Sequence, residues 1–383
     1  MFKFRSLLLS LVLLLGLLPV QADEEISMFA SPTATAAPVI SGQAATQQPA
    51  EEPVATISPE LLLLPDGSTQ ITISAAGDLT FGGDIRKRGL SIFDQELKKQ
   101  DGDLTFVTRN IRELLTEDDL TLVNFETTLT TAPVYKKNNR FVFSAPPEYV
   151  KILTSGSIEA VSFENNHALD HGEAGIEETR QHLDAAGIVW SSEDHVGLYE
   201  VRGVRIAMLA YQTFNNQYPR LYEKVPQDIA AAKAQSDIVI VSYHWGDEED
   251  YAPNANQQKL GRLTIDAGAD LVVGHHSHRI NPIEYYNGKY IVYSLANFSF
   301  AGNTRPSDMS SFLFQVRFHV KDGMATTNAF RIVPFRISSK TDYNDFIPTQ
   351  FTDQRHIDNV INVLKSNGKK LEYAVAEYPI DWE

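Results

Sequence analysis

The sequence predicts an α/β fold with mixed β-sheets, and three observations support this prediction. Short apolar runs rich in β-branched residues recur along the chain, as is typical of strands buried on both faces. Segments with helical periodicity lie between several of these runs. Polar residues that could bind a ligand follow the runs directly. Such alternation places helices on the faces of a largely parallel sheet.

Six segments have the sequence of buried strands, because each is an apolar run bounded by polar residues or glycine. In chain order they are residues 69–77, 120–126, 160–165, 205–212, 237–245 and 270–276. Two later segments, 288–300 and 312–320, are closer to hairpin strands. We therefore expect the sheet to be mixed or doubled.

Helical patterns fall between these strands. Residues 106–119 precede the second strand, residues 172–187 follow the third, and residues 254–268 precede the sixth. Residues 353–367 predict a closing helix near the end of the sequence.

Composition excludes several classes of function. The 383 residues carry a formal charge of −16, which argues against a nucleic-acid binder, because neutralising phosphates requires clustered Lys and Arg. The chain contains no cysteine, so a disulfide framework and a thiolate zinc site are excluded. Any metal must be bound by His, Asn, Asp or Glu.

Residues 1–22 are predicted to be a signal peptide. Lys3 and Arg5 precede the apolar stretch Leu7–Val20, and small residues precede the expected cleavage after Ala22. An uncleaved membrane anchor is the alternative, although the stretch is short compared with the roughly 20 residues of a membrane span. We expect a secreted or extracytoplasmic protein, associated in some cases with the cell wall or membrane.

The remainder divides into three parts. Residues 23–67 are rich in Ala, Thr, Pro, Ser and Gln and are predicted to be a disordered tether, because they cannot bury enough apolar surface to offset the entropy lost on ordering. Residues 68–340 are the predicted folded domain. Residues 341–383 form a C-terminal extension that contains the closing helix.

Oxygen and nitrogen ligands lie at the ends of five of the predicted strands. Because ligands bind at the carboxyl ends of strands in open α/β sheets, these side chains are expected to share one edge. The set comprises Asp78, Asn124, Glu126, Asn165, Asn166, His167, His244, His275, His276 and His278.

The histidines are expected to bind a metal. His276 and His278 are two residues apart, so both rings can reach one centre, and a buried apolar run precedes them. His244 ends another buried strand. The alternatives are solvated surface histidines for the pair and a core histidine bonded to backbone for His244. We expect His275 to pack against or orient its neighbours.

The segment 165–170 combines an amide, an imidazole and a carboxylate. The carbonyl of Asn166 can be a neutral metal ligand, although Asn is also an ordinary turn former. His167 is placed to contact whatever the metal polarises. Asp170 is expected to hold His167 in its useful tautomer.

Two carboxylates complete the predicted ligands. Asp78 is interpreted as a metal ligand, whereas Asp84 is equally a second ligand, a substrate contact or a helix N-cap. If two metals lie side by side, one carboxylate must lie between them to offset their repulsion. Glu126 is the best candidate for this bridge.

Taken together, these motifs resemble the CapA (PGA_cap) family. That family is tied to poly-γ-glutamate capsule synthesis and belongs to the calcineurin-like metallophosphatase superfamily. The similarity runs in order over residues 70–303, through segments 77–84, 124–130, 165–172, 182–188, 244–248, 266–278 and 291–300. It implies a four-layer αββα sandwich with mixed sheets and a dinuclear site at the strand ends.

The resemblance also assigns roles to individual residues. Asp78 corresponds to the aspartate of the first motif, Glu126 to the bridging aspartate, and Asn166 with His167 to the Asn-His motif. His244 matches the isolated fourth-motif histidine, and His276 with His278 match the His-x-His pair. Thr80 stands where the superfamily has a histidine, and Glu replaces Asp at the bridge. We therefore expect one of two divalent metals, Mn, Fe or Zn, to be bound more weakly.

Three functions are compatible with these observations. The first is a secreted metal-dependent hydrolase, most naturally a phosphoesterase, acting on a cell-envelope polymer or phosphoester with His167 and Asp170 as its catalytic pair. The second is a non-catalytic factor that binds poly-γ-glutamate beside a membrane synthase and export complex. Here the basic segment 135–140 would offset the negative charge, unless it is a plain solvated loop. The third is a nucleotidase or wall-directed phosphodiesterase that shares only the scaffold.

Overall fold

The computed structural model describes residues 63–87, 89–135, 141–214 and 216–382. The predicted signal peptide, the predicted tether up to residue 62 and residues 136–140 of the basic segment lie outside these ranges. No helix within the described ranges is both long and apolar enough to cross a membrane.

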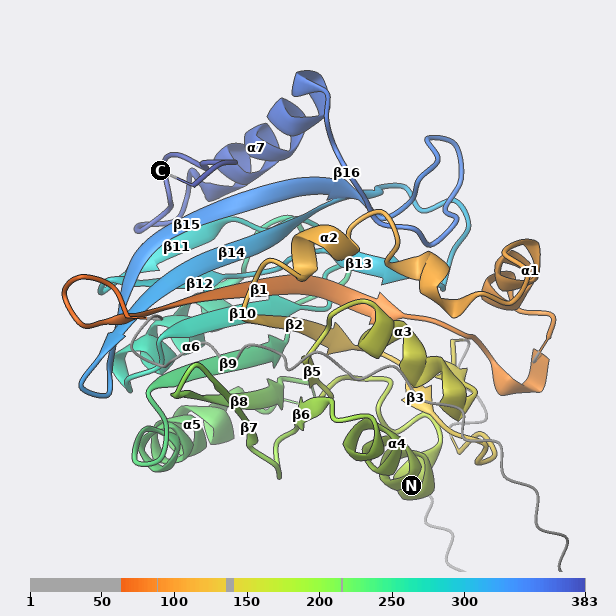
Figure 1. The fold of residues 1–383 in the computed structure, drawn as a ribbon, viewed down its shortest axis with the longest axis horizontal. Helices are drawn as coiled ribbons and strands as arrows, with labels where there is room; N and C mark the ends of the chain where they lie inside the picture. The colour runs from red at the N-terminus through yellow and green to blue at the C-terminus, as the bar shows by residue number, and fades with distance from the viewer. Residues whose placement is uncertain (1–62, 88, 136–140, 215, 383) are drawn as a thin grey trace, which may run out of the picture. The chain divides into compact units, whose positions relative to one another are not determined.

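The larger of two mixed sheets formed by the described residues has eight strands (Figure 1). Its order is β16-β15-β14-β1-β2-β5-β6, and β13 also pairs with β1. The strands β1, β2, β5, β6 and β13 run parallel to one another, whereas β14, β15 and β16 pair in antiparallel fashion, with β14 joined to β1. The bounds are β1 Thr69–Thr80, β2 Leu120–Phe125, β5 Ala160–Ser162, β6 Val189–Ser191, β13 Asn297–Phe300, β14 Ser310–Lys321, β15 Met324–Arg336 and β16 Thr349–Gln350.

The second sheet has six strands in the order β11-β12-β10-β9-β8-β7. Strands β8, β9, β10 and β12 are parallel, and β7 and β11 are antiparallel edge strands. The bounds are β7 Gly197–Val201, β8 Val204–Gln212, β9 Ile238–His244, β10 Leu271–His275, β11 Ile283–Tyr286 and β12 Lys289–Val292. A separate short pair is formed by β3 (Thr128–Leu129) and β4 (Ser144–Ala145).

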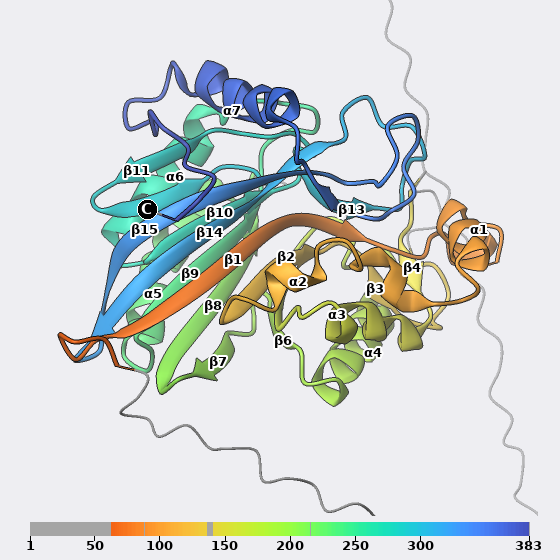
Figure 2. The same cartoon turned by 45° about the horizontal axis from the view of Figure 1, so that its top comes forward.

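The sheets pack face to face, and helices cover their outer faces. On β9, Ile238 and Ile240 point into the core between the sheets, while Val239 and Val241 pack against helices, as the two-residue period of a strand requires. Figure 2 shows α2 to α4 beside the first sheet and α5 and α6 beside the second. The helices are α1 Ile92–Lys99, α2 Arg112–Leu115, α3 Lys151–Ser155, α4 Gly172–Ala185, α5 Tyr218–Lys233, α6 Ala255–Asp266 and α7 Gln354–Gly368. The fold is therefore the expected αββα sandwich with mixed sheets.

Helix α7 contributes to the core between the sheets. Its apolar face, Ile357, Val360 and Leu364, is buried there among residues of β14 and β15. Asp353 caps the helix by accepting a hydrogen bond from the amide of His356. The C-terminal segment thus packs on the same core as the strands that position the site.

The predicted helix at 106–119 is wrong in its length. The structure has a 3-10 turn at Leu104–Val107 and a single helical turn, α2, at Arg112–Leu115. Thr108, Asn110 and Ile111 lie between them, and all three residue types have low helix propensity. Burial of Ile111 in the core stabilises the bend.

The predicted hairpin segment 288–300 is divided between the two sheets. It contributes β12 to the second sheet and β13 to the first, so residues 293–296 cross from one sheet to the other. This crossing packs tightly on both sheets. A Cβ at Gly77 would lie 2.1 Å from the carbonyl oxygen of Ala296, and one at Gly274 would lie 2.1 Å from that of Tyr293. Glycine is required at both positions, next to the site.

Candidate metal centre

The expected ligands come together at the carboxyl ends of strands from both sheets. Asp78 lies near the end of β1, opposite Asn124 of β2, and Glu126 follows β2 directly. In the second sheet, His244 ends β9 and is paired in register with His275 at the end of β10. The first sheet therefore supplies carboxylates, and the second supplies imidazoles.

One group consists of Asp78, Glu126 and His278, each with a ligand atom within 4.8 Å of the others. Nδ1 of His278 lies 3.0 Å from Oδ2 of Asp78. The backbone amide of His276 donates to the same oxygen at 3.2 Å. These contacts join the two sheets at the site.

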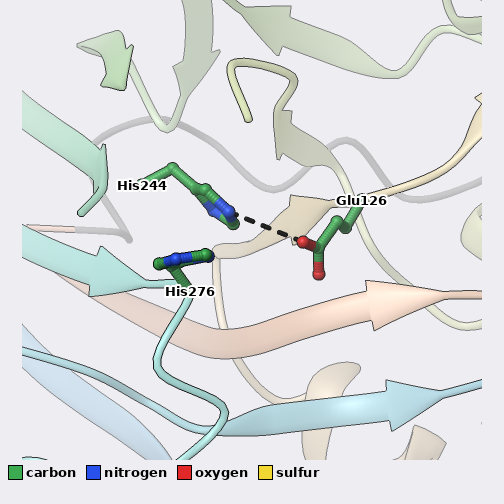
Figure 3. A group of neighbouring side chains, drawn as sticks. All are labelled: Glu126, His244 and His276. Atoms are coloured by element: carbon green, nitrogen blue, oxygen red, sulfur yellow. Dashed lines mark ion pairs between the residues drawn. The ribbon is translucent and has the colours of Figure 1, made fainter. Parts of the chain in front are cut away.

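The second group consists of Glu126, His244 and His276, again within 4.8 Å of one another. Figure 3 shows these three side chains turned toward a common space, with Nε2 of His244 3.5 Å from Oε1 of Glu126. Oδ1 of Asn166 lies 3.0 Å from the same Nε2. Glu126 belongs to both groups, which is the position expected of a bridging carboxylate.

The donor set fits divalent metal ions. Glu126 is 1% exposed, and neither of its carboxylate oxygens has a hydrogen-bond partner among the described residues. Nδ1 of His276 is likewise buried without a partner there. An uncompensated buried carboxylate is costly, and a cation between these atoms would offset that cost. Carboxylate, amide and imidazole donors suit Mn, Fe or Zn.

The electrostatics of the metal-free site separate the ligands into two kinds. Burial, together with the charge of His278, lowers the pKa of His276 to about 4, and burial holds the pKa of His244 well below its usual value. These two rings are therefore neutral at pH 7 and present lone pairs. Burial, reinforced by the charge of Asp78, raises the pKa of Glu126 to about 7.

Asp78 and His278 form an ion pair in the metal-free site. Burial is the largest single effect and disfavours both charges, but the hydrogen bond between the two groups and the neighbouring charges together outweigh it. The pKa of His278 is consequently raised to about 9, and that of Asp78 is held well below its usual value. A metal ion binding here takes the place of a proton on His278.

His167 lies beside the groups and is oriented by Asp170. Nδ1 of His167 is 2.7 Å from Oδ2 of Asp170, which also accepts a hydrogen bond from the amide of Phe143 at 3.0 Å. The ring of Phe143 packs edge-on against that of His167, with centroids 4.6 Å apart. With Nδ1 directed at the carboxylate, Nε2 is the nitrogen available to a ligand.

Two asparagines hold the arrangement together. Asn124 donates from Nδ2 to Oδ1 of Asp78 at 2.8 Å, and the same nitrogen is 3.2 Å from Nδ1 of His244. Asn165 donates to the carbonyl of Phe125 at 2.9 Å, and its Oδ1 accepts from the amide of His167. Asn165 therefore fixes the loop that carries Asn166 and His167.

Three other residues considered from the sequence, Asp84, Thr80 and His275, make contacts within the protein. Asp84 accepts a hydrogen bond from the amide of Arg86 and pairs with its side chain, as a cap of a 3-10 turn does. The hydroxyl of Thr80 accepts a hydrogen bond from the amide of Ala301 at 2.7 Å. His275 is buried, with Nδ1 3.6 Å from Oδ1 of Asp78.

Sequence reasoning missed Asn297 and Phe214. Oδ1 of Asn297 lies 2.9 Å from Nδ1 of His278, and the ring of Phe214 packs against those of His244 and His276. Asn297 follows an apolar run, which could have marked it as a candidate, but its contact with His278 depends on the crossing between the sheets at 293–296 and has no signal in the sequence. Phe214 has no comparable signal.

The backbone at the histidine pair is unusual. His276 has a φ of 91° and His278 a φ of 53°, both in the left-handed region that non-glycine residues rarely adopt. Such conformations cost about 1–3 kcal/mol each and persist where surrounding contacts impose them. Here the contacts with Asp78 and Asn297 do so.

Comparison with known proteins identifies the family. Residues 72–301 match the family described as bacterial capsule synthesis protein PGA_cap. The chain belongs to the PGA_cap family. The matched range of this PGA_cap protein contains every expected ligand, from Asp78 to His278.

Curated proteins similar to this PGA_cap chain come from several bacteria. The PGA biosynthesis protein CapA of Bacillus subtilis (strain 168) is 32% identical over 283 residues, covering 68% of this chain and 72% of that protein. The capsule biosynthesis protein CapA of Bacillus anthracis is 27% identical over 294 residues, covering 70% and 68%. A probable polyglutamine synthesis accessory protein of Mycobacterium tuberculosis is 31% identical over 207 residues, covering 46% and 54%.

Among solved structures, this PGA_cap protein is similar to the calcineurin-like phosphoesterase YfkN from Bacillus subtilis. The TM-score is 0.44 and the sequence identity 14%, with 79% of this chain and 100% of the other covered.

Proposed function

We propose that this PGA_cap protein is a metal-dependent hydrolase that acts outside the cytoplasm in the synthesis of poly-γ-glutamate or another envelope polymer. The observation that carries the proposal is Glu126, buried without a hydrogen-bond partner in the described residues and shared by both ligand groups. The relatives named for PGA and capsule biosynthesis support the polymer. The predicted signal peptide supports the location.

Each ligand has a defined place in this proposal. Asp78 and His278 would hold one divalent ion, while His244, His276 and Asn166 would hold the other, with Glu126 between them. When bound, the ions supply a hydroxide nucleophile at neutral pH and polarise the attacked group. Asp78 and Glu126 together provide two negative charges that offset the ions.

Two residues of the chain, His167 and Asp170, would supply the proton that the leaving atom takes. Asp170, fixed by the amide of Phe143, keeps a proton on Nδ1 of His167 and orients the ring. Nε2 can then donate to the leaving atom or stabilise charge that develops on it. His167 is only partly buried, with 13% of its side chain exposed, so its proton can be replaced from solvent.

A second candidate function is a non-catalytic factor that binds poly-γ-glutamate beside a membrane synthase and export complex. The name of the Mycobacterium tuberculosis relative, a synthesis accessory protein, favours it. In that function the metals would contact substrate carboxylates or support the fold.

One set of assays separates these functions. The purified chain is analysed for bound metal, then assayed with bis-p-nitrophenyl phosphate, nucleotides and poly-γ-glutamate in the presence of Mn, with chelator controls. We expect hydrolysis of the polymer or a phosphoester, abolished by chelator. Retention of the polymer with no turnover of any substrate would support the binding factor and overturn the hydrolase.

A further inference from the structure

Two cavities open at the candidate metal centre, one beside each ligand group. The first, which we call the aromatic cavity, has a volume of about 280 Å³ and is lined by His278, His167 and Phe300. The second, the Arg220 cavity, has a volume of about 330 Å³ and is lined by Asn166 and Arg220. Among the described residues, none lines both cavities. His278 of the first group therefore borders one space, and Asn166, which contacts His244 of the second group, borders the other.

The aromatic cavity has one aromatic wall, suited to a flat or apolar group, whereas polar residues that include Glu248 and Glu249 line the rest. The rings of Phe143 and Phe300 meet edge to face with centroids 6.1 Å apart, and Phe300 lies 4.9 Å from the ring of His278. The one arginine in the lining, Arg279, is engaged by the protein: it donates to the carbonyl of His278 at 3.0 Å and to Ser307 at 2.8 Å.

The Arg220 cavity is lined mainly by polar side chains. Leu169, Glu193 and Gln212 also line a third cavity of about 460 Å³, so the two cavities are neighbours. Arg220 forms an ion pair with Glu193 and donates from Nε to the side chain of Gln217 at 2.6 Å. Polar groups of a substrate chain can therefore be accommodated on this side of the centre.

We propose that the centre cleaves an internal linkage of an extended substrate, a diester or an amide within a chain, rather than a terminal monoester. A monoester has a substituent on one side only and would leave one cavity empty, whereas an internal linkage fills both. This inference rests on the proposed hydrolase function and deepens it by naming the class of bond.

His167 sets the direction in which the substrate lies. Its ring lines the aromatic cavity, so the leaving part occupies that cavity and the retained part occupies the Arg220 cavity. The oxygen of water bonds to the central phosphorus or carbonyl carbon, and the bond from that atom to the leaving oxygen or nitrogen breaks. Its electron pair stays on the leaving atom, which takes a proton from Nε2 of His167. The proton released by water passes to solvent, which reprotonates His167.

Two bulky substitutions test this arrangement with probes that share a leaving group. Gln217→Trp fills part of the Arg220 cavity, and Asn303→Trp, at an exposed lining residue, fills part of the aromatic cavity. Gln354→Trp, on the exposed face of α7, is the matched control. The probes are p-nitrophenyl phosphate and bis-p-nitrophenyl phosphate, and the readout is kcat/KM with Mn.

The proposal predicts different patterns for the two variants. Wild type should prefer the diester by about tenfold or more, and Gln217→Trp should lower diester kcat/KM about tenfold more than monoester kcat/KM. Asn303→Trp should lower both to a similar extent, because both esters expel the same group. Equal effects of Gln217→Trp on the two esters, or a preference for the monoester, overturn the proposal.

A binding measurement keeps this inference separate from the hydrolase function. If wild type cleaves neither ester, the proposed phosphoesterase chemistry is wrong. Calorimetry then measures the binding of γ-linked glutamate oligomers to the metal-free chain. It shows whether a bound oligomer occupies one of the two cavities or both. A long oligomer should bind more tightly than the γ-linked dimer, and each Trp variant should weaken the long oligomer about tenfold. No binding, or weakening by only one variant, overturns the two-sided site.

Discussion

Nδ1 of His167 lies 2.7 Å from Oδ2 of Asp170, and the same carboxylate oxygen accepts the amide of Phe143. This pair is built like an oriented general acid: the carboxylate is fully buried, and the imidazole reaches a cavity beside the ligands. Neither residue belongs to the two groups that could hold a metal. Proton transfer and metal binding can therefore be separated by mutation.

We expect His167→Ala to retain its metal and to lose about a hundredfold or more in kcat, because a positioned acid contributes roughly that factor. Metal content is measured by elemental analysis and turnover with bis-p-nitrophenyl phosphate. His356→Ala, which removes a half-buried histidine remote from the site and paired with Asp353 at the same three-residue spacing, is the control. Loss of metal from His167→Ala would show that its role is misassigned.

Asp170→Asn should act through His167. The amide cannot accept the Nδ1 proton with the strength of a carboxylate, so we expect a smaller fall in kcat, about tenfold, and an altered pH profile of kcat. An unchanged pH profile would mean that Asp170 only supports the loop through its contact with Phe143.

Glu126→Gln should have opposite effects on metal binding and on the stability of the metal-free protein. Gln is nearly isosteric but neutral, so the shared ligand loses its charge and metal stoichiometry should fall. Because burial raises the pKa of Glu126 from 4.5 to about 7, the metal-free fold loses stability as the pH rises from about 4.5 to about 7. Removing the charge should raise the free energy of unfolding at pH 8 by about 1–3 kcal/mol.

Urea unfolding with chelator, at pH 5 and pH 8, measures the stability effect of Glu126→Gln. The gain in the free energy of unfolding should be present at pH 8 and small at pH 5, where Glu126 of wild type is protonated in the folded state. Full metal content in the variant would contradict the bridging role, and an equal gain at both pH values would contradict the electrostatic cause.

Metal removal should destabilise wild type at pH 8, because ions that bind only the folded state add to its stability. At a free metal concentration a hundredfold above Kd, the contribution is about 2.7 kcal/mol per site. Differential scanning fluorimetry with chelator and then with added Mn should show a reversible fall in Tm. Asp78→Asn, which leaves the proposed ligands of the second ion in place, should show a smaller response than wild type; an equal response would place the metal elsewhere.

The sequence predicted the strands and most of the candidate ligands that the fold brings together for one physical reason. Buried strands are apolar along their length, so a polar residue such as Asp78, Glu126 or His244 at the end of such a run is conspicuous. The parallel arrangement then places those ends at one edge. Both features are local in the sequence.

The contacts that depend on tertiary packing could not be found in this way. Asn297 reaches His278 because residues 293–296 cross from one sheet to the other, and the sequence of that segment equally suits a hairpin. The helix expected at 106–119 failed because burial of Ile111 at the bend outweighed its apolar period. The two cavities likewise arise from loops that are distant in the sequence.

Asp118 provides a test of pH dependence away from the metal centre. Its carboxylate lies beside the start of β2, where Oδ2 accepts a hydrogen bond from the hydroxyl of Thr121 at 2.8 Å. Burial, which outweighs that hydrogen bond, raises the pKa of Asp118 from 3.8 to about 7. Since the folded state holds this proton more tightly than the unfolded state, the stabilisation is present below pH 4 and is lost as the pH rises to 7.

Asp118→Asn should therefore flatten the pH dependence of stability between pH 4 and pH 7. An amide can still accept the hydrogen bond from Thr121, and it does not ionise between pH 4 and pH 8. Relative to wild type, we expect the free energy of unfolding to rise by about 2 kcal/mol at pH 8 and to change very little at pH 4. The rise is smaller than the full pKa shift implies because Asp118 is partly exposed. Asp342→Asn, at an exposed position, should change neither value. Urea unfolding in the presence of chelator measures these differences. If the gain in the free energy of unfolding is the same at both pH values, the charge of Asp118 is solvated in the folded state. Burial beside β2 is then not what raises its pKa.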